Sequence, residues 1–127
     1  MKLNPDCIRD ILLWAEKYTD AGTYVKFERH NQVPEELSAY TKEVFIYHVN
    51  QCKNFGLVLY DERIPLTFLF KITDLSKEGH TFLANIRENA NWNKTKKIAN
   101  TIGTNSLDAL KDIASNVISE LIIKNFK

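Results

Sequence analysis

At 127 residues, with 44% hydrophobic and 26% charged side chains, the chain is long enough to bury the core of one domain, and its composition excludes wholesale disorder. A formal net charge of +1 excludes a uniformly basic surface of the kind that dedicated nucleic-acid-binding domains carry. The charge is uneven, because residues 91–127 hold six basic and three acidic side chains and are the one clearly positive segment.

The cysteines and the lengths of the apolar runs indicate the cellular compartment in which the protein is expected. Cys7 and Cys52 each fall on the apolar side of an expected helix, which predicts buried thiols in a reducing environment. The chain has no basic-then-apolar leader and no apolar run that approaches the ~20 residues of a membrane span. We therefore expect a soluble, cytoplasmic protein with no membrane partner.

The first expected element is an amphipathic helix over residues 4–19. Asn4 suits the capping position, Pro5 suits the first helical position, and Asp6 stabilises the positive end of the helix dipole. Apolar residues then recur at helical spacing, at Cys7 or Ile8, Ile11, Leu12, Trp14 or Ala15, and Tyr18. The polar and glycine residues at 20–22 end this helix.

Residues 23–33 alternate between the two faces of a strand. Thr23, Val25 and Phe27 would lie on one side, and such alternation of β-branched and aromatic residues predicts a short strand. Residues 34–39 form at best a short helix, which is a stunted version of the second helix of a helix-turn-helix. Thr41 is the expected cap of the next helix.

The stretch 42–58 contains the most regular pattern in the chain. Its apolar positions recur at spacings of three and four, at Phe45, His48, Val49, Cys52 and Phe55. Gly56 follows at once, where a helix commonly ends in a left-handed residue. Leu57–Tyr60 is then expected to form a strand.

A β-hairpin is expected after this helix. Two apolar runs, Leu57–Tyr60 and Thr67–Ile72, flank the charged turn Asp61–Pro65, and this arrangement is typical of a hairpin. In a winged-helix domain such a hairpin is the wing.

Another helix is expected to begin at Ile72, with Thr73 or Asp74 as its cap. Its buried side would hold Leu75, Gly79, Phe82, Leu83 and Ile86. A glycine inside a helix costs about 1 kcal/mol relative to alanine, so we expect Gly79 to allow close packing against the hairpin.

Two helices are expected in the C-terminal segment. Asn89-Ala90-Asn91 is interpreted as a polar break, followed by a helix from Asn93 to Ile102 that Gly103 stops. Ser106 is expected to cap the last helix. The apolar stripe of that helix comprises Leu107, Leu110, Ile113, Ala114, Val117, Ile118, Leu121 and Ile122. A helix this apolar either folds back on the domain or meets a partner helix.

Together these elements predict an α+β fold. Residues 1–90 would form a winged-helix core with a β-hairpin wing, and residues 91–127 a C-terminal helical extension, packed on the core or on a partner. The order of central helix, Asn54-Phe55-Gly56, Leu57-Val58 and strand resembles the way the third helix of small bacterial helix-turn-helix regulators leads into the wing.

Five segments of the chain are similar to a bacterial family described as a domain of unknown function. They are Met1–Asp10, Tyr47–Cys52 with Gly56-Leu57, Glu78–Arg87, Trp92–Ala99, and Ser106–Ser115. The resemblance covers nearly the whole chain. It implies a winged-helix-like core and a bacterial or phage setting, because the family is frequent in prophages and mobile elements. It implies no catalytic residues.

Histidines and cysteines do not form a catalytic or metal-binding pattern in this sequence. His48 and Cys52 share a helix face, but no CxxC or HxxxH pattern supplies further ligands, so we expect structural packing and no metal. His80, beside Lys77 and Glu78, is expected to be a hydrogen-bonded structural residue. Nucleophile elbows and glycine-rich phosphate loops are absent, so we expect neither an enzyme nor a cofactor.

The first functional hypothesis is binding of duplex DNA through the central helix. Asn50 and Gln51 have the side chains that pair with adenine edges. The expected nucleic-acid contacts are Lys42, Tyr47, Asn50, Gln51 and Lys53, with Lys94, Lys96 and Lys97 as further phosphate contacts. The acidic residues of the wing turn, Asp61 and Glu62, oppose this hypothesis because phosphate would repel them.

The alternative is a protein-interaction module on the same scaffold. Ile46 and Tyr47 are large apolar groups on the otherwise polar face of the central helix, and such groups suit a protein interface. The expected interface residues are Ile46, Tyr47, Leu110, Val117 and Leu121. The partner would be a host or phage protein, or a second copy of the chain meeting the last helix.

Overall fold

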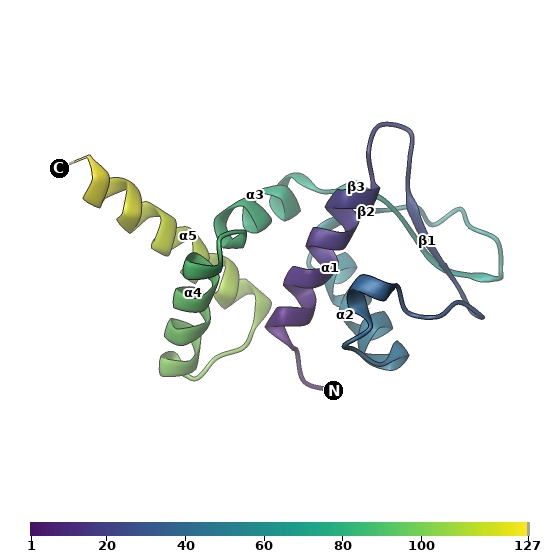
Figure 1. The fold of residues 1–127 in the computed structure, drawn as a ribbon, viewed down its shortest axis with the longest axis horizontal. Helices are drawn as coiled ribbons and strands as arrows, with labels where there is room; N and C mark the ends of the chain where they lie inside the picture. The colour runs from purple at the N-terminus through teal and green to yellow at the C-terminus, as the bar shows by residue number, and fades with distance from the viewer. Residues whose placement is uncertain (127) are drawn as a thin grey trace. The chain divides into compact units, whose positions relative to one another are not determined.

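The computed structural model describes residues 1–126 and has an α+β fold (Figure 1). Five α-helices and one small antiparallel sheet of three strands make up this part of the chain. The chain divides into two compact units, residues 6–80 in the first and residues 1–5 with residues 81 onward in the second.

The first unit contains all three strands. In chain order its elements are α1 (Pro5–Tyr18), β1 (Val25–Glu28), the short 3-10 helix η1 (Glu35–Leu37), α2 (Lys42–Asn54), β2 (Val58–Tyr60) and β3 (Phe68–Leu75). The strand order is β1-β3-β2 and both pairings are antiparallel. The eight residues of β3 therefore lie between the two shorter strands and pair with both.

Side chains alternate between the two faces of the sheet, and the apolar face packs against the core. Val25 pairs with Ile72 and Phe27 with Phe70, and all four side chains are buried. Charged side chains occupy the opposite face, where Lys26 pairs with Lys71. This period of two is what the sequence of residues 23–28 predicts.

Four aromatic rings from four different elements form the centre of this unit. The ring of Phe45 on α2 lies 5.1 Å from Phe27, 5.8 Å from Phe70 and 5.7 Å from Trp14, centroid to centroid. All three pairs meet edge to face, which is a favourable geometry for aromatic quadrupoles. The cluster holds α2 against both the sheet and α1, and so determines which side of α2 faces solvent.

Most of the elements expected in the first unit lie where the sequence places them. The side chain of Thr41 caps α2 by accepting a hydrogen bond from the Val44 amide, at 3.3 Å. Gly56 has φ +68°, the left-handed conformation expected at the end of this helix. Both interpretations are confirmed, as is the short helix at residues 35–37.

The expected start of the following helix is wrong. Strand β3 continues to Leu75, which pairs with Val58, and α3 spans Lys77–Ile86. Ser76 is the cap in place of Thr73 or Asp74, because its Oγ accepts a hydrogen bond from the Gly79 amide at 3.0 Å. The central strand needs its last residues to pair with β2, and this tertiary requirement overrides the helical pattern of residues 72–75.

Gly79 packs as the sequence predicts. A Cβ atom at this position would lie 1.9 Å from the backbone oxygen of Leu57, the residue that leads into β2. No side chain other than hydrogen fits there, so the glycine permits the close approach of α3 to the hairpin.

The second unit consists of the rest of α3, α4 (Asn89–Ile102) and α5 (Leu107–Asn125). Helix α4 begins at Asn89 with Glu88 at the capping position, so the interpretation of residues 89–91 as a break is wrong. The side chains of Asn89 and Ala90 are exposed in the first turn, and an exposed turn needs no apolar residue. Hydrophobic periodicity therefore detects the helix only from the buried Trp92 onward.

Helices α4 and α5 pack against each other. Gly103 ends α4 with φ +86°, and the Ser106 side chain caps α5 by accepting from the Ala109 amide at 3.1 Å. Both features agree with the sequence. Leu110, Ala114 and Val117 of α5 are buried.

Within residues 1–126, no helix combines the length and the apolar character that crossing a membrane requires.

Candidate nucleic-acid interface

The exposed face of α2 is defined by the residues that it buries. Phe45, His48, Val49 and Cys52 all point into the core. At 100° per residue, the opposite face is centred on Glu43, Tyr47, Asn50 and Asn54, and both asparagines are exposed. Tyr47 is half-buried within this face, Ile46 is half-buried at its margin, and Gln51 is half-buried on the far flank.

Lys42 lies where three segments of the first unit meet. Its Nζ donates a hydrogen bond of 2.5 Å to the backbone oxygen of Arg29 and lies 5.5 Å from the centre of the Phe27 ring. The Arg29 Nε in turn donates to the backbone oxygen of Leu66, at 3.3 Å, and the Arg29 amide donates to Thr67 at 3.0 Å. Arg29 and Lys42 therefore link three segments, which are the start of α2, the end of β1 and the β2–β3 loop.

Lys53 occupies the other end of the same flank of α2. Its Nζ lies 4.1 Å from the centre of the Tyr60 ring and 3.4 Å from an oxygen of Glu62. Lys42 and Lys53 are 11 positions apart, which corresponds to about 16 Å along the helix axis at 1.5 Å per residue. One ammonium group thus marks each end of the exposed face, on the side of α2 next to the hairpin.

Arg29 and His30 are two exposed basic residues that sequence reasoning missed. They follow β1 directly, and no periodic pattern or motif singles them out. The contact of Arg29 with Lys42 joins residues 13 positions apart, and no local pattern in the sequence specifies it. We call Arg29, His30 and Lys42 the basic edge.

The acidic residues of the hairpin are both paired with lysines. Lys71 lies 3.4 Å from Asp61, and Lys53 lies 3.4 Å from Glu62. The pKa of Asp61 is held below its usual range, first by the hydrogen bond from the Arg63 amide and then by Lys71. The acidic charge expected to repel phosphate is therefore offset locally.

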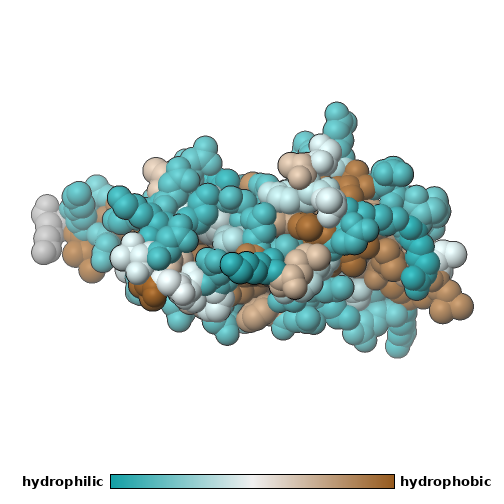
Figure 2. Space-filling model, turned by 90° about the horizontal axis from the view of Figure 1, so that it is seen from below, coloured by the Kyte–Doolittle hydropathy of each residue, from teal (hydrophilic) through white to brown (hydrophobic). Residues whose placement is uncertain are grey.

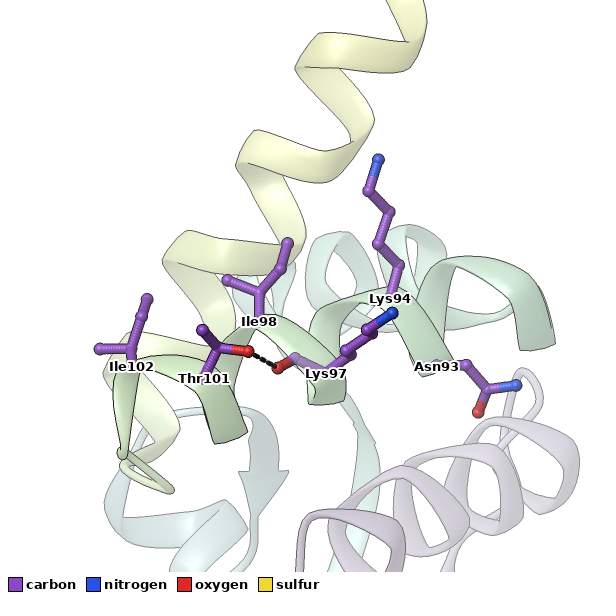
Figure 3. A pocket seen from close by; sticks show the side chains of 6 residues that line it. All are labelled: Asn93, Lys94, Lys97, Ile98, Thr101 and Ile102. Carbon is purple, nitrogen blue, oxygen red and sulfur yellow. Dashed lines mark hydrogen bonds between the residues drawn. The ribbon is translucent and has the colours of Figure 1, made fainter.

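The three lysines of α4 lie in the second unit and differ in their surroundings. Lys94 and Lys97 line a pocket of about 610 Å³ (Figure 3). All the residues around it come from α4, namely Asn93, Lys94, Lys97, Ile98, Thr101 and Ile102. Lys94 also lies 3.9 Å from Glu120 of α5, whereas Lys96 turns its ammonium over the Trp92 ring at 5.5 Å.

The residues proposed for a protein interface have unequal exposure. Leu110 and Val117 are each 1% exposed in the single chain, so this part of α5 is buried within the chain itself. Leu121 is half-buried. Beyond it, the last turns of α5 expose Ile122, Ile123 and Phe126.

His48, His80 and the two cysteines differ in their surroundings. His48 is 1% exposed, with its Nδ1 2.7 Å from the Val44 oxygen. The His80 Nε2 lies 3.1 Å from the Asp74 carboxylate at the edge of a second hollow, of about 630 Å³. Burial raises the pKa of Cys7 to about 12 and also raises that of Cys52. Residues 1–126 contain no group of three or more histidine, cysteine or acidic side chains arranged to hold a metal ion.

The fold and this interface define a small α+β protein with a basic edge beside a polar helix face. The chain belongs to the family DUF2513, described as hypothetical protein, whose sequence profile matches residues 2–105. An uncharacterized protein of Haemophilus influenzae is 29% identical over 127 residues, which covers 96% of this chain and 99% of that protein. No solved structure matches the chain. The prediction of a domain of unknown function is confirmed.

Proposed function

We propose that the first unit is a winged-helix module that binds duplex DNA, with α2 in the major groove and the β2–β3 loop as the wing. The element order α1, β1, η1, α2, β2, β3 supports this proposal, because α2 is followed directly by the antiparallel pair β2 and β3, whose loop can serve as a wing. In this arrangement η1 takes the place of the second helix of a helix-turn-helix.

The exposed face of α2 carries side chains suited to base edges. Asn50 and Gln51 pair with adenine, and Glu43 accepts a hydrogen bond from the amino group of cytosine. Tyr47 packs beside them against the groove. These residues would supply the sequence preference.

The observation that carries the proposal is the spacing of the cations along α2. Lys42 and Lys53 are separated by about 16 Å along the axis and lie on the same flank of α2. An α2 lying in the major groove would bring both ammonium groups to the phosphate strand on that side. The basic edge adds Arg29 and His30 to the Lys42 end, and phosphate contacts of this kind orient the protein on the duplex.

The pair between Lys53 and Glu62 does not prevent such a contact. Its side chains are 36% and 77% exposed, and exposed ion pairs contribute about 0–1 kcal/mol. A phosphate can therefore replace the carboxylate at little cost. Lys94, Lys96 and Lys97 are further phosphate contacts in this proposal, with Lys96 the least available because it lies over Trp92.

The setting proposed is the bacterial cytoplasm, in keeping with the resemblance to a family frequent in prophages. An accessory or regulatory protein of a phage or prophage would act there on DNA.

The second candidate function is protein binding on the same scaffold without DNA. The exposed end of α5 favours it, because Ile122, Ile123 and Phe126 are 53%, 58% and 86% exposed. Large apolar groups gathered on one surface are typical of an interface. A second copy of the chain, or a host or phage protein, would cover these side chains, and Ile46 and Tyr47 of the first unit would be a separate contact surface.

The test is fluorescence anisotropy of a labelled mixed-sequence duplex at 50 and 200 mM salt. With about four phosphate contacts from the first unit alone, the affinity should fall by at least roughly 100-fold between these two salt concentrations. Lys42→Gln and Lys53→Gln should each weaken binding and reduce the salt dependence. The matched control is Lys17→Gln on α1, which removes the same charge from a site outside the interface and should bind as the wild type does.

Absence of binding at 50 mM salt would contradict the DNA proposal. The protein-binding candidate would then be tested by the oligomeric mass of the chain and of an Ile122→Ser/Phe126→Ser variant.

A further inference from the structure

Leu66 is the most exposed large hydrophobic side chain within residues 1–126, at 93%. It lies in the loop between β2 and β3, directly after Pro65. In Figure 2, hydrophobic side chains reach the surface at the right-hand end, where Figure 1 has this loop. A single exposed leucine is common on protein surfaces. The backbone of Leu66, however, is fixed by hydrogen bonds, and the cationic side chain of Arg29 lies beside it.

The loop presents Leu66 from a backbone that is fixed on both sides. The Phe68 amide donates to the Pro65 oxygen at 3.0 Å and closes a turn around Leu66. The Arg29 side chain binds the oxygen of Leu66 itself, and its amide binds Thr67. The side chain therefore points outward from a held turn and contributes nothing to the core.

Arg29 links the leucine to the basic edge. Its guanidinium binds the Leu66 oxygen, and its own oxygen accepts from Lys42 at the start of α2. Arg29 thus joins the Leu66 turn to Lys42 at the start of α2. In duplex DNA, one phosphate strand separates a major groove from the adjacent minor groove. With α2 in the major groove and that strand on Arg29 and Lys42, the loop meets the minor groove.

We infer that Leu66 is an apolar wedge that enters the minor groove of bound DNA, partly unstacks a base step and bends the duplex. This inference rests on the proposed DNA-binding function. Apolar side chains of this size act as wedges in minor-groove proteins, and the cost of unstacking is offset by the contacts that a bent duplex makes. Flexible pyrimidine–purine steps such as TA open most easily, so they are the steps that Leu66 selects.

The charges around the loop allow this approach. Asp61 and Glu62 are paired with Lys71 and Lys53, and Ile64-Pro65-Leu66 beyond them carries no charge. Arg29 lies beside the leucine and offers its remaining N–H groups to the phosphates that flank the opened step.

The experiment uses 20-base-pair duplexes with 2-aminopurine next to a central TA step and a donor and acceptor dye at the two ends. Wild-type protein should raise both the 2-aminopurine fluorescence and the energy transfer. Leu66→Ser should abolish both changes and weaken binding by roughly tenfold, with the salt dependence of binding unchanged. A duplex with a central AA step should respond less to the wild type.

The control variant is Ile102→Ser, which replaces another exposed aliphatic side chain, 66% exposed on α4. It should bend the TA duplex as the wild type does. Thermal unfolding of Leu66→Ser should match the wild type, since the side chain has no core contacts. Wild-type binding with no 2-aminopurine or energy-transfer change, or unchanged signals with Leu66→Ser, would overturn the wedge. No wild-type binding at all would overturn the proposed function and the wedge with it.

Discussion

Gly79 on α3 lies directly against the backbone of Leu57, so closely that a Cβ atom at residue 79 would be 1.9 Å from the Leu57 oxygen. The same oxygen accepts a hydrogen bond of 3.0 Å from the Ser76 amide. One carbonyl group therefore joins the residue before β2 to the turn that ends β3 and begins α3. This contact holds the base of the hairpin in the first unit.

Gly79→Ala should lower the free energy of unfolding by about 2 kcal/mol or more, measured by urea denaturation followed by circular dichroism. Alanine gains about 1 kcal/mol of helix propensity, but its methyl group overlaps a backbone atom that cannot move aside like a flexible side chain. Gly22→Ala is the matched control. Gly22 has φ +82° and no atom within 4 Å of the place a methyl group would take, so only the left-handed strain of about 1 kcal/mol applies. An equal loss in the two variants would contradict the packing argument.

Ser76→Ala should cost about 1 kcal/mol of stability in the same assay. The Ser76 hydroxyl accepts from the Gly79 amide and donates to the Gly56 oxygen, so it caps α3 and also binds the end of α2. Ser115→Ala, at an exposed position in the middle of α5, should leave stability unchanged or slightly higher. If Ser76→Ala is neutral, the hydroxyl is not the effective cap.

Val117→Asp should destabilise the protein by about 3 kcal/mol or more, because it places a carboxylate where the side chain is 1% exposed. The measurement is thermal or urea unfolding, together with the mass in solution. Asn116→Asp, exposed at the neighbouring position, should change stability by no more than about 0.5 kcal/mol. A Val117→Asp protein of wild-type stability would mean that α5 does not pack against α4 as described.

The two thiols should resist alkylation in the folded protein at pH 8 and react after unfolding in urea. Burial raises the pKa of Cys7 from 9.0 to about 12 and raises that of Cys52 as well, so neither forms the reactive thiolate. The unfolded chain ionises above pH 9 while the folded chain stays protonated up to about pH 12. The unfolded state then binds fewer protons, and stability should fall as the pH rises from 9 towards 12. Rapid native labelling at pH 8 would contradict the burial of these thiols.

Glu62→Gln should strengthen binding of duplex DNA up to about fivefold at 50 mM salt. The change removes the carboxylate 3.4 Å from Lys53, and an exposed pair of this kind holds up to about 1 kcal/mol. Anisotropy with the labelled duplex measures the effect. Glu35→Gln on η1 removes the same charge away from the hairpin and is the control. Equal gains from both variants would indicate a general charge effect and no role for Lys53.

Local chemistry made much of the first unit predictable from sequence. The stripe Phe45–Cys52, the Thr41 cap and the left-handed Gly56 define α2 within a residue or so, because each depends on neighbours three or four positions away. Two boundaries were wrong for opposite reasons. The first turn of α4 is exposed and lacks an apolar signal, and the end of β3 is decided by a partner strand, Val58 pairing with Leu75.

The candidate site divides in the same way. The sequence by itself determined which residues α2 turns outward, since the helical period and the buried stripe leave Asn50 and Asn54 exposed. It also determined the close packing at Gly79. Only the tertiary structure brought Arg29 beside Lys42 and Leu66, and only it paired the acidic residues of the hairpin with Lys53 and Lys71. The two contacts of Arg29 join residues that are 13 and 37 positions apart in the sequence. Such contacts depend on how the strands pair, and no local sequence pattern encodes that pairing.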